Sequence, residues 1–237
     1  MKPFKVFLLV VFLFSTPQAA SPLSQHDFRW RDYYQPIQDK HARLLLYKAL
    51  EYVTAHLGNP SQKIKEIHLC LSRPKDKHAH IKKDFQLTEI NDFSGGEFTI
   101  YLSHQPSESA FLGRLVHEIT HLLDPRIHDP YMEGLSTVMA ERYYKEQGLD
   151  WNAWLAYFQS GQDPFYARTY FMMREIYAAA GEEHMRNFHT YTKSDPARPE
   201  HLHIDTERWL QNLAPEARSR VKGIIDRYNS PVPLSKL

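Results

Sequence analysis

The stretch Leu112–Pro125, Leu-Gly-Arg-Leu-Val-His-Glu-Ile-Thr-His-Leu-Leu-Asp-Pro, decides which fold and which chemistry are expected of this chain. Apolar residues surround its polar ones, so a helix formed here is buried, and its polar face must line a cleft or be paired. His117 and His121 are four residues apart and lie one turn apart on one helical face. Two such imidazoles can reach one zinc ion, and Glu118 can reach the water that the ion holds.

The helix around this motif has clear expected limits. Ser107 is the expected N-cap, and Glu108 follows in the first turn, where an acid suits the helix dipole. The helix is expected to extend to about Leu123, because Pro125 stops it. A second helical stretch is expected after a short loop, over residues 131–147.

The rest of the chain predicts a helix, a small sheet and a helical C-terminal part. Residues 39–57 have apolar residues at spacings of three and four, and Gly58 and Pro60 end that helix. Residues 22–36 are expected to be an irregular lead-in. The segments expected to be strands are residues 64–71, 85–90 and 97–102. Further helices are expected over residues 150–192 and 205–229. This order predicts an α+β fold with a small mixed sheet packed against helices.

The beginning of the chain has the order of parts of a secretory signal peptide. A short basic start is followed by an unbroken apolar run over residues 6–14 and then by small residues. This run is too short for a bilayer, which needs about 20 apolar residues. Cleavage is expected after Ala20 or Ser21, without a stable membrane span afterwards, and the mature protein is expected to be periplasmic or secreted.

Composition and charge argue against several classes of function. Lys and Arg number 29 and Asp and Glu number 28, so no field of one sign favours nucleic acid or an anionic membrane. Cys70 is the only cysteine, cannot form an internal disulfide and is expected to be buried in a strand. An exported chain of this size without disulfides fits a bacterial product better than a eukaryotic ectodomain. The basic segment from Ser72 to Asp84 is expected to be a solvated connection.

A catalytic zinc site needs three protein ligands and an open fourth position. The acidic and histidine candidates that follow the motif are Asp124, His128, Asp129, Glu133 and Glu141. The metzincin pattern fails, because Asp124 stands at its glycine position and Ile127 at its third histidine position. Asp124 can instead hydrogen-bond a ligand imidazole or be an ordinary acid at a helix end, and the sequence leaves both open.

Glu133 fits the third ligand position best. It opens the next helix, in Pro-Tyr-Met-Glu-Gly-Leu over residues 130–135, and the small Gly134 would let two helices approach closely. Glu141 lies on roughly the same face and stays as the alternative ligand. Its structural role would be a salt bridge to Arg114 or to another base.

The motif followed by a short loop and Pro-aromatic-x-Glu-Gly-Leu resembles the gluzincin metallopeptidases, above all small members in which a Glu-Gly pair opens the second active-site helix. The resemblance covers roughly residues 97–144 and implies a zincin-like fold. It also implies an edge strand that aligns the substrate backbone, here residues 97–102 by strand addition. The site residues that it implies are His117, His121 and Glu133 as zinc ligands and Glu118 as general base.

The expected function is a zinc metallopeptidase that hydrolyses a peptide or protein substrate. Zinc would activate a water, and Glu118 would take its proton and pass it to the leaving amine. The oxyanion needs a second donor, for which the candidates are Tyr166, Arg168, Tyr170, His184, His189 and Tyr191. Among them Tyr170 is preferred. The alternative is a catalytically silent zincin-fold protein that binds peptides or an envelope partner, and the intact Glu118 favours the enzyme.

The chain is thus expected to have three parts. Residues 1–21 are the signal peptide, residues 22–147 the zincin-like catalytic core with both motif helices, and residues 148–237 a helical part packing on that core. The remaining histidine pairs, which are expected to be solvated loop residues, are His78 with His80 and His201 with His203.

Overall fold

The computed structural model describes residues 34–72 and 86–230. They form a small mixed sheet and a larger helical part, which confirms the general fold class expected from the sequence. Within these ranges, no helix combines the length and the apolar character needed to cross a membrane. The expected signal peptide, His78 and His80 lie outside the described residues.

Helix α1 (Lys40–Leu57) follows from a capping residue and a buried stripe. Asp39 Oδ1 accepts hydrogen bonds from the backbone N–H groups of His41 at 2.6 Å and Ala42 at 3.1 Å. The buried residues that recur at spacings of three and four are Ala42, Leu46, Ala49, Val53 and Leu57. The helix ends at Gly58, whose φ of 90° is a conformation that favours glycine.

The sheet has the strand order β1–β2–β4–β3. Its strands are β1 (Tyr34–Pro36), β2 (Glu66–Ser72), β3 (Gln86–Asp92) and β4 (Glu97–Leu102). β2 and β4 are parallel, whereas β1 pairs with β2 and β3 with β4 in antiparallel fashion. Phe98, Ile100 and Leu102 point into the main core, while Tyr101 packs with Cys70 on the opposite face. Both faces of β4 are therefore buried, and Cys70 is a buried strand residue as expected.

Two expectations for the strands are wrong. Residues 97–102 form an interior strand with a partner on each side, so their backbone cannot add a substrate strand. The edge position next to β4 belongs to β3. Residues 34–36, expected to be irregular, form β1 because they pair with residues 70–72. Both outcomes depend on pairing between distant segments, which local periodicity does not encode.

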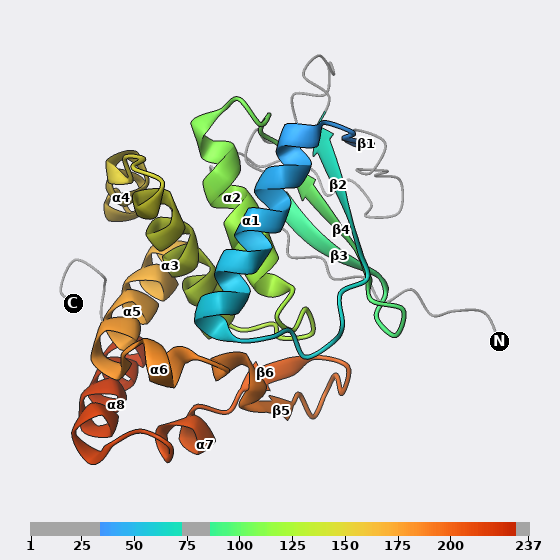
Figure 1. Cartoon of the computed structure of the whole chain (residues 1–237). Helices are drawn as coiled ribbons and strands as arrows, with labels where there is room; N and C mark the ends of the chain where they lie inside the picture. Colours follow the sequence, from blue (N-terminus) through green and yellow to red (C-terminus); the bar gives the residue numbers. More distant parts are fainter. Residues whose placement is uncertain (1–33, 73–85, 231–237) are drawn as a thin grey trace, which may run out of the picture.

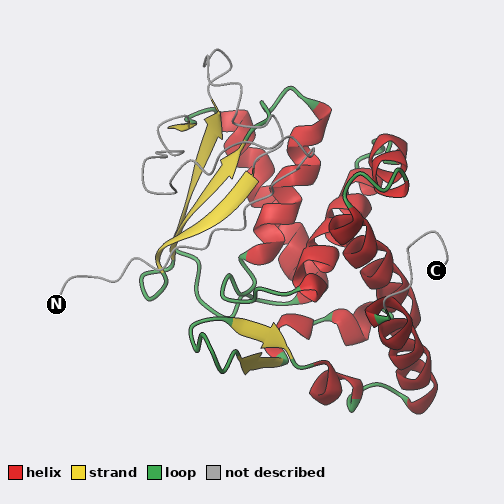
Figure 2. Ribbon diagram, turned by 180° about the vertical axis from the view of Figure 1, so that it is seen from behind, coloured by secondary structure: helices red, strands yellow, loops and turns green. Residues whose placement is uncertain are grey.

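Helices α2 (Ser109–His121) and α3 (Pro130–Glu146) carry the motif residues. Figure 1 shows α1 and α2 over one face of the sheet, and Figure 2 shows the same layers from behind. The helices that follow are α4 (Asn152–Gln159), α5 (Pro164–Ala180), α6 (Glu182–Met185), η2 (Phe188–Thr190), α7 (Thr206–Leu210) and α8 (Pro215–Asn229). α3 packs on α2, α5 on α3 and α8 on α5, and one hydrophobic cluster includes residues from α1 to α8.

A hairpin lies between the two helical stretches that the sequence predicted over residues 150–192 and 205–229. Its strands are β5 (Thr192–Ser194) and β6 (Leu202–Ile204). The backbone N–H of Leu202 donates to Arg126 O at 2.8 Å, and the N–H of His128 donates to Leu202 O at 3.0 Å. The hairpin therefore fixes the loop between α2 and α3, which sets how these two helices meet.

Candidate metal centre

Helix α2 places its two histidines on one buried face. His117 and His121 are each 5% exposed, and nearly every residue from Phe111 onward is buried. The helix begins one residue later than expected, with Glu108 instead of Ser107 as the capping position. Glu108 does not cap the helix with its side chain but accepts from the backbone N–H of Gln105 at 2.5 Å. The burial pattern, rather than a side-chain cap, thus defines this helix.

Helix α3 begins at a tightly held aspartate. Asp129 Oδ1 accepts from the backbone N–H groups of Tyr131 and Met132, both at 3.0 Å. Asp129 Oδ2 accepts from the N–H of Ile204 in β6 at 2.5 Å, which ties the start of α3 to the hairpin. Glu133 follows in the first turn, where a negative charge is favoured by the helix dipole. These contacts hold the start of α3, the turn that carries Glu133, in place.

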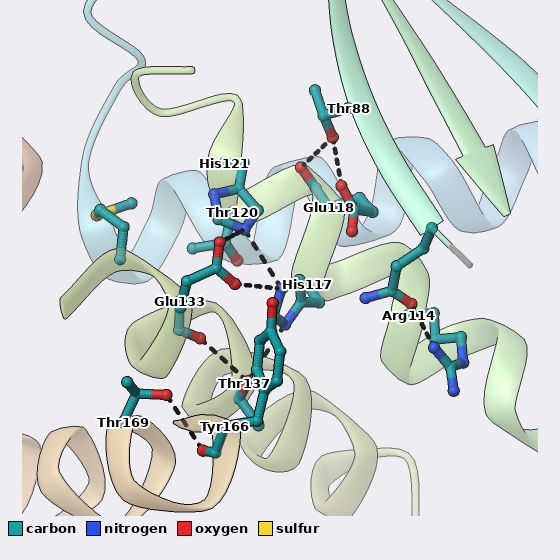
Figure 3. A network of polar contacts seen from close by, with 12 residues as sticks. Thr88, Arg114, His117, Glu118, Thr120, His121, Glu133, Thr137, Tyr166 and Thr169 are labelled. Carbon is teal, nitrogen blue, oxygen red and sulfur yellow. Dashed lines mark hydrogen bonds and ion pairs between the residues drawn. The ribbon is translucent and has the colours of Figure 1, made fainter. Parts of the chain in front are cut away.

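The side chains of His117, His121 and Glu133 converge on one point (Figure 3). The two Nε2 atoms are 3.3 Å apart. Glu133 Oε2 lies 3.4 Å from His117 Nε2, and Glu133 Oε1 lies 3.7 Å from His121 Nε2. Ligand atoms about 2.0–2.2 Å from a tetrahedral ion are themselves separated by roughly 3.3–3.6 Å. The separations in this cluster are close to these values, so the three side chains could hold a metal ion.

The opposite charges of Glu133 and His121 stabilise each other. Burial opposes the charged form of Glu133, but the adjacent His121 and His117 outweigh it and hold the pKa of Glu133 well below its usual range. Burial likewise opposes the charged form of His121, but the Glu133 carboxylate raises the pKa of that imidazole. A cation at the centre would satisfy the same carboxylate while leaving both imidazoles neutral.

Two hydroxyl groups, neither of them predicted from the sequence, contact the motif side chains. Thr137 Oγ1 donates to Glu133 O at 3.0 Å and lies 3.3 Å from His117 Nδ1. A His117 ring that donates its Nδ1–H to this hydroxyl would present Nε2 to a metal ion. Thr88 Oγ1, from β3, lies 2.7 Å from Glu118 Oε2. No pattern marks such residues in a sequence, because Thr88 and Thr137 come from other elements.

Glu118 is a buried carboxyl group beside the cluster. Burial raises its pKa, against the opposing effect of the charges on His117 and His121. Its Oε2 is held by Thr88, while Oε1 is buried without a hydrogen-bond partner among the described residues. A buried oxygen of this kind is costly unless a bound molecule uses it.

The other candidate ligands have different partners. Glu141 accepts from Lys145 Nζ at 2.6 Å and from Tyr170 Oη at 2.9 Å, so its salt bridge is not with Arg114. Asp124 forms a double hydrogen bond with Arg126 at 2.9 and 2.7 Å instead of contacting a ligand imidazole. Among the described residues, only one group has metal-binding geometry, and these acids are not part of it.

The remaining histidine candidates also lie outside the cluster of His117, His121 and Glu133. The His128 ring stacks on His201 with ring centroids 4.2 Å apart. His203 Nε2 lies 3.3 Å from Asp195 Oδ2. The pair His201 and His203 is therefore only partly exposed and has side-chain partners, whereas the sequence predicted solvated loop residues.

Tyr166, rather than Tyr170, lies beside the cluster and lines the same cavity as His117. Figure 3 shows the Tyr166 ring extending from α5 toward His117. Burial raises the Tyr166 pKa far above its usual range, and Glu133 and Glu118 raise it further because their charges lie close. The preference for Tyr170 was wrong, since its hydroxyl is bound to Glu141 at 2.9 Å. Three other candidates bind backbone carbonyls elsewhere: Arg168 that of Tyr228, His184 that of Ala180 and His189 that of Asn59. The sixth candidate, Tyr191, has the Arg208 guanidinium 5.8 Å from its ring centroid.

Gly134 permits a close contact between α3 and α5, whereas the contact expected from the sequence was between α3 and the motif helix α2. A Cβ at this position would lie 2.2 Å from Thr169 O and 2.6 Å from Met173 Cγ, so the glycine brings α3 against α5. Replacing Gly134 by Ala should push these helices apart and destabilise the protein by about 1–3 kcal/mol or more. Thermal unfolding should show a melting temperature lower by about 2–4 °C for each kcal/mol.

Gly223 in α8 provides the matched control for this substitution. A Cβ there would meet no atom within 4 Å. Gly223→Ala should therefore stabilise the protein slightly, by about 0.5–1 kcal/mol, because alanine restricts the unfolded chain and favours helix. A Gly134→Ala protein that melts at the wild-type temperature would contradict the assigned contact.

No protein family, curated protein or solved structure matches this chain.

Proposed function

We propose that the protein is a zinc-dependent metallopeptidase of the gluzincin type, with His117, His121 and Glu133 as the zinc ligands. The observation that carries the proposal is the buried triangle of two Nε2 atoms and one carboxylate, with separations of 3.3–3.7 Å. Two imidazoles and one carboxylate with an open fourth position form the donor set of many catalytic zinc sites. The zincin-like fold is part of the same proposal. So is action outside the cytoplasm, which is inferred from the signal-peptide pattern of residues 1–21.

When bound, zinc supplies Lewis acidity that polarises a substrate carbonyl and makes a water acidic. Glu118 is the general base of the proposed reaction. Thr88 holds Oε2 at 2.7 Å, so Oε1 is the oxygen left to receive a proton and to return it to the leaving amine. Burial raises the pKa of Glu118, which makes its carboxylate a better base than an exposed one.

Strand β3 is the proposed support for the substrate backbone. Among the described residues it has β4 as a strand neighbour on one side only, and the extended peptide is proposed to pair along its other edge. Thr88 lies on β3 and touches Glu118, which puts this edge beside the proposed base. Strand addition thus stays part of the proposal, with β3 in place of residues 97–102 as the strand that aligns the substrate.

Tyr166 is the proposed second donor to the oxyanion. Tyr166→Phe should lower the turnover number by about 10²–10³-fold, as expected for loss of one such donor. Zinc content should stay unchanged, because Tyr166 is not one of the three proposed ligands. The measurement is steady-state hydrolysis of a peptide, with kcat and KM determined separately.

Tyr170→Phe is the matched control, because it removes the same atom one helical turn away. The Tyr170 hydroxyl binds Glu141 and not the metal cluster, so its loss should cost stability and leave turnover near wild type. Equal losses of turnover in both variants, or none in Tyr166→Phe, would rule out the assigned role.

The proposed function is tested by metal content and peptide cleavage together. Purified protein is incubated with zinc, dialysed and assayed by elemental analysis, and a peptide mixture is then searched for cleavage products by mass spectrometry. About one equivalent of zinc and cleavage that a chelator abolishes support the peptidase. A protein that takes up no zinc overturns it. Zinc binding without cleavage, unchanged in Glu118→Ala, indicates instead a silent zincin-fold protein that binds peptides.

A further inference from the structure

A cavity of about 320 Å³ opens beside the metal centre. His117 belongs to its lining, so the cavity and the proposed metal site share a side chain. The aromatic residues that form its walls are Trp151, Trp154, Tyr157, Phe158 and Tyr166. Most of them come from α4 and the residue before it, and the small Ala140 of α3 also lines the cavity. The volume is at the lower end of the range for ligand pockets, about 300–1,000 Å³, and suits one large side chain.

The aromatic walls are fixed by their own packing. The Trp151 and Trp154 rings are stacked with centroids 5.4 Å apart, and Phe158 stacks on Tyr170 at 4.7 Å. The Arg114 guanidinium lies 5.1 Å from the Trp154 ring centroid and donates to Gln86 Oε1 at 2.8 Å. The inner surface therefore consists mainly of rings held in place, which favours a flat apolar group.

The cavity is located where a substrate residue next to the cleaved bond would lie. Along α2, Arg114 lines the cavity and Glu118, one turn later, is the proposed base. Along β3, Gln86 lines the cavity and Thr88 holds Glu118. Residues two apart on a strand share a face and are separated by about 6.6 Å. An extended peptide on β3 would therefore pass a residue of the cavity lining and the proposed base within one two-residue repeat.

We infer that this cavity binds a large aromatic side chain, Phe, Tyr or Trp, of the substrate residue adjacent to the cleaved bond. The inference rests on the proposed function and assigns that function a substrate class. Gln162 lines the cavity and is exposed, so the cavity extends to a residue that solvent reaches.

Cleavage-site profiling of a peptide mixture provides the first test. Wild type should cleave next to aromatic residues at least about 10-fold more efficiently than next to alanine, the scale on which apolar pockets discriminate by size. Ala140→Leu should fill the cavity and reduce that preference by about 10-fold or more, with zinc content unchanged. Ala156→Leu adds the same group on the exposed side of α4 and should keep the wild-type preference. An unselective wild type, or an unchanged preference in Ala140→Leu, overturns the inference.

Binding of indole, measured by calorimetry on metal-free protein, provides a second test that does not require hydrolysis. Wild type and Ala156→Leu should bind indole with similar affinity, and Ala140→Leu should bind it at least about 10-fold more weakly. Trp154→Ala, which removes one wall of the cavity, should also weaken indole binding. It replaces Ala140→Leu as the test variant if Ala140→Leu does not fold. Indole binding without peptide cleavage would reject the proposed peptidase and keep the aromatic pocket. Absence of indole binding to wild type would reject the pocket whether or not peptides are cleaved.

Discussion

Glu118→Gln is expected to lower peptide hydrolysis by about 10²–10⁴-fold, the usual contribution of a general base. The amide has the shape of the carboxyl group but cannot accept the water's proton. Thr88 can still donate to the oxygen of the substituted amide, so the local structure should persist. The measurement is kcat/KM on one cleaved peptide, with zinc content determined on the same preparations.

The same substitution should not reduce stability. Glu118 is 2% exposed, and its Oε1 has no hydrogen-bond partner among the described residues. Replacing a buried, incompletely paired carboxylate by a neutral amide removes a charge that is costly to bury. The melting temperature of metal-free Glu118→Gln should therefore equal or exceed that of metal-free wild type. Such a pattern, with activity lost and stability kept, is characteristic of a functional site rather than a structural one.

Glu141→Gln provides the matched control, because Glu141 is also a buried carboxylate, at 4% exposure. It accepts from Lys145 and Tyr170, so its replacement should cost about 1–3 kcal/mol and leave turnover near wild type. Full activity in Glu118→Gln would remove Glu118 from the mechanism. Loss of zinc from Glu141→Gln would show that the wrong glutamate had been assigned as ligand.

The sequence predicts the parts of this molecule that depend on neighbouring residues. Asp39 and Gly58 mark the two ends of α1, and β4 has the bounds expected for residues 97–102. The spacing of His117 and His121 puts both on one face of a helix, and the structure brings Glu133 to them. Each of these expectations follows from helical or strand periodicity, capping or turn residues within a short window.

The errors arise where distant segments meet. Nothing local distinguishes an edge strand from an interior one, so the position of β4 between β2 and β3 was missed. The strands β5 and β6 have three residues each, too few for a periodic pattern. Tyr166 and Tyr170 are one helical turn apart on α5. Which of them lies beside the cluster of His117, His121 and Glu133 depends on how α5 packs on α3.

Zinc is expected to raise the melting temperature of metal-free protein by about 8–16 °C when free zinc exceeds its Kd about 1,000-fold. Binding to the folded state alone at that ratio contributes about 4.1 kcal/mol, and each kcal/mol raises the melting temperature of a chain of this size by about 2–4 °C. The unfolded chain offers no such site, because Glu133 comes from a different helix than the two histidines.

His121→Ala should abolish this rise, because two remaining ligands cannot form the three-cornered site. The variant is also expected to be less stable without metal, since the buried Glu133 loses the imidazole 3.7 Å from its Oε1. The informative quantity is therefore the change on adding zinc, measured by thermal unfolding of each protein with zinc and with chelator. His128→Ala is the control, because His128 stacks on His201 outside the cluster and should retain the full zinc response. A zinc response in His121→Ala, or none in wild type, would be incompatible with the proposed ligands.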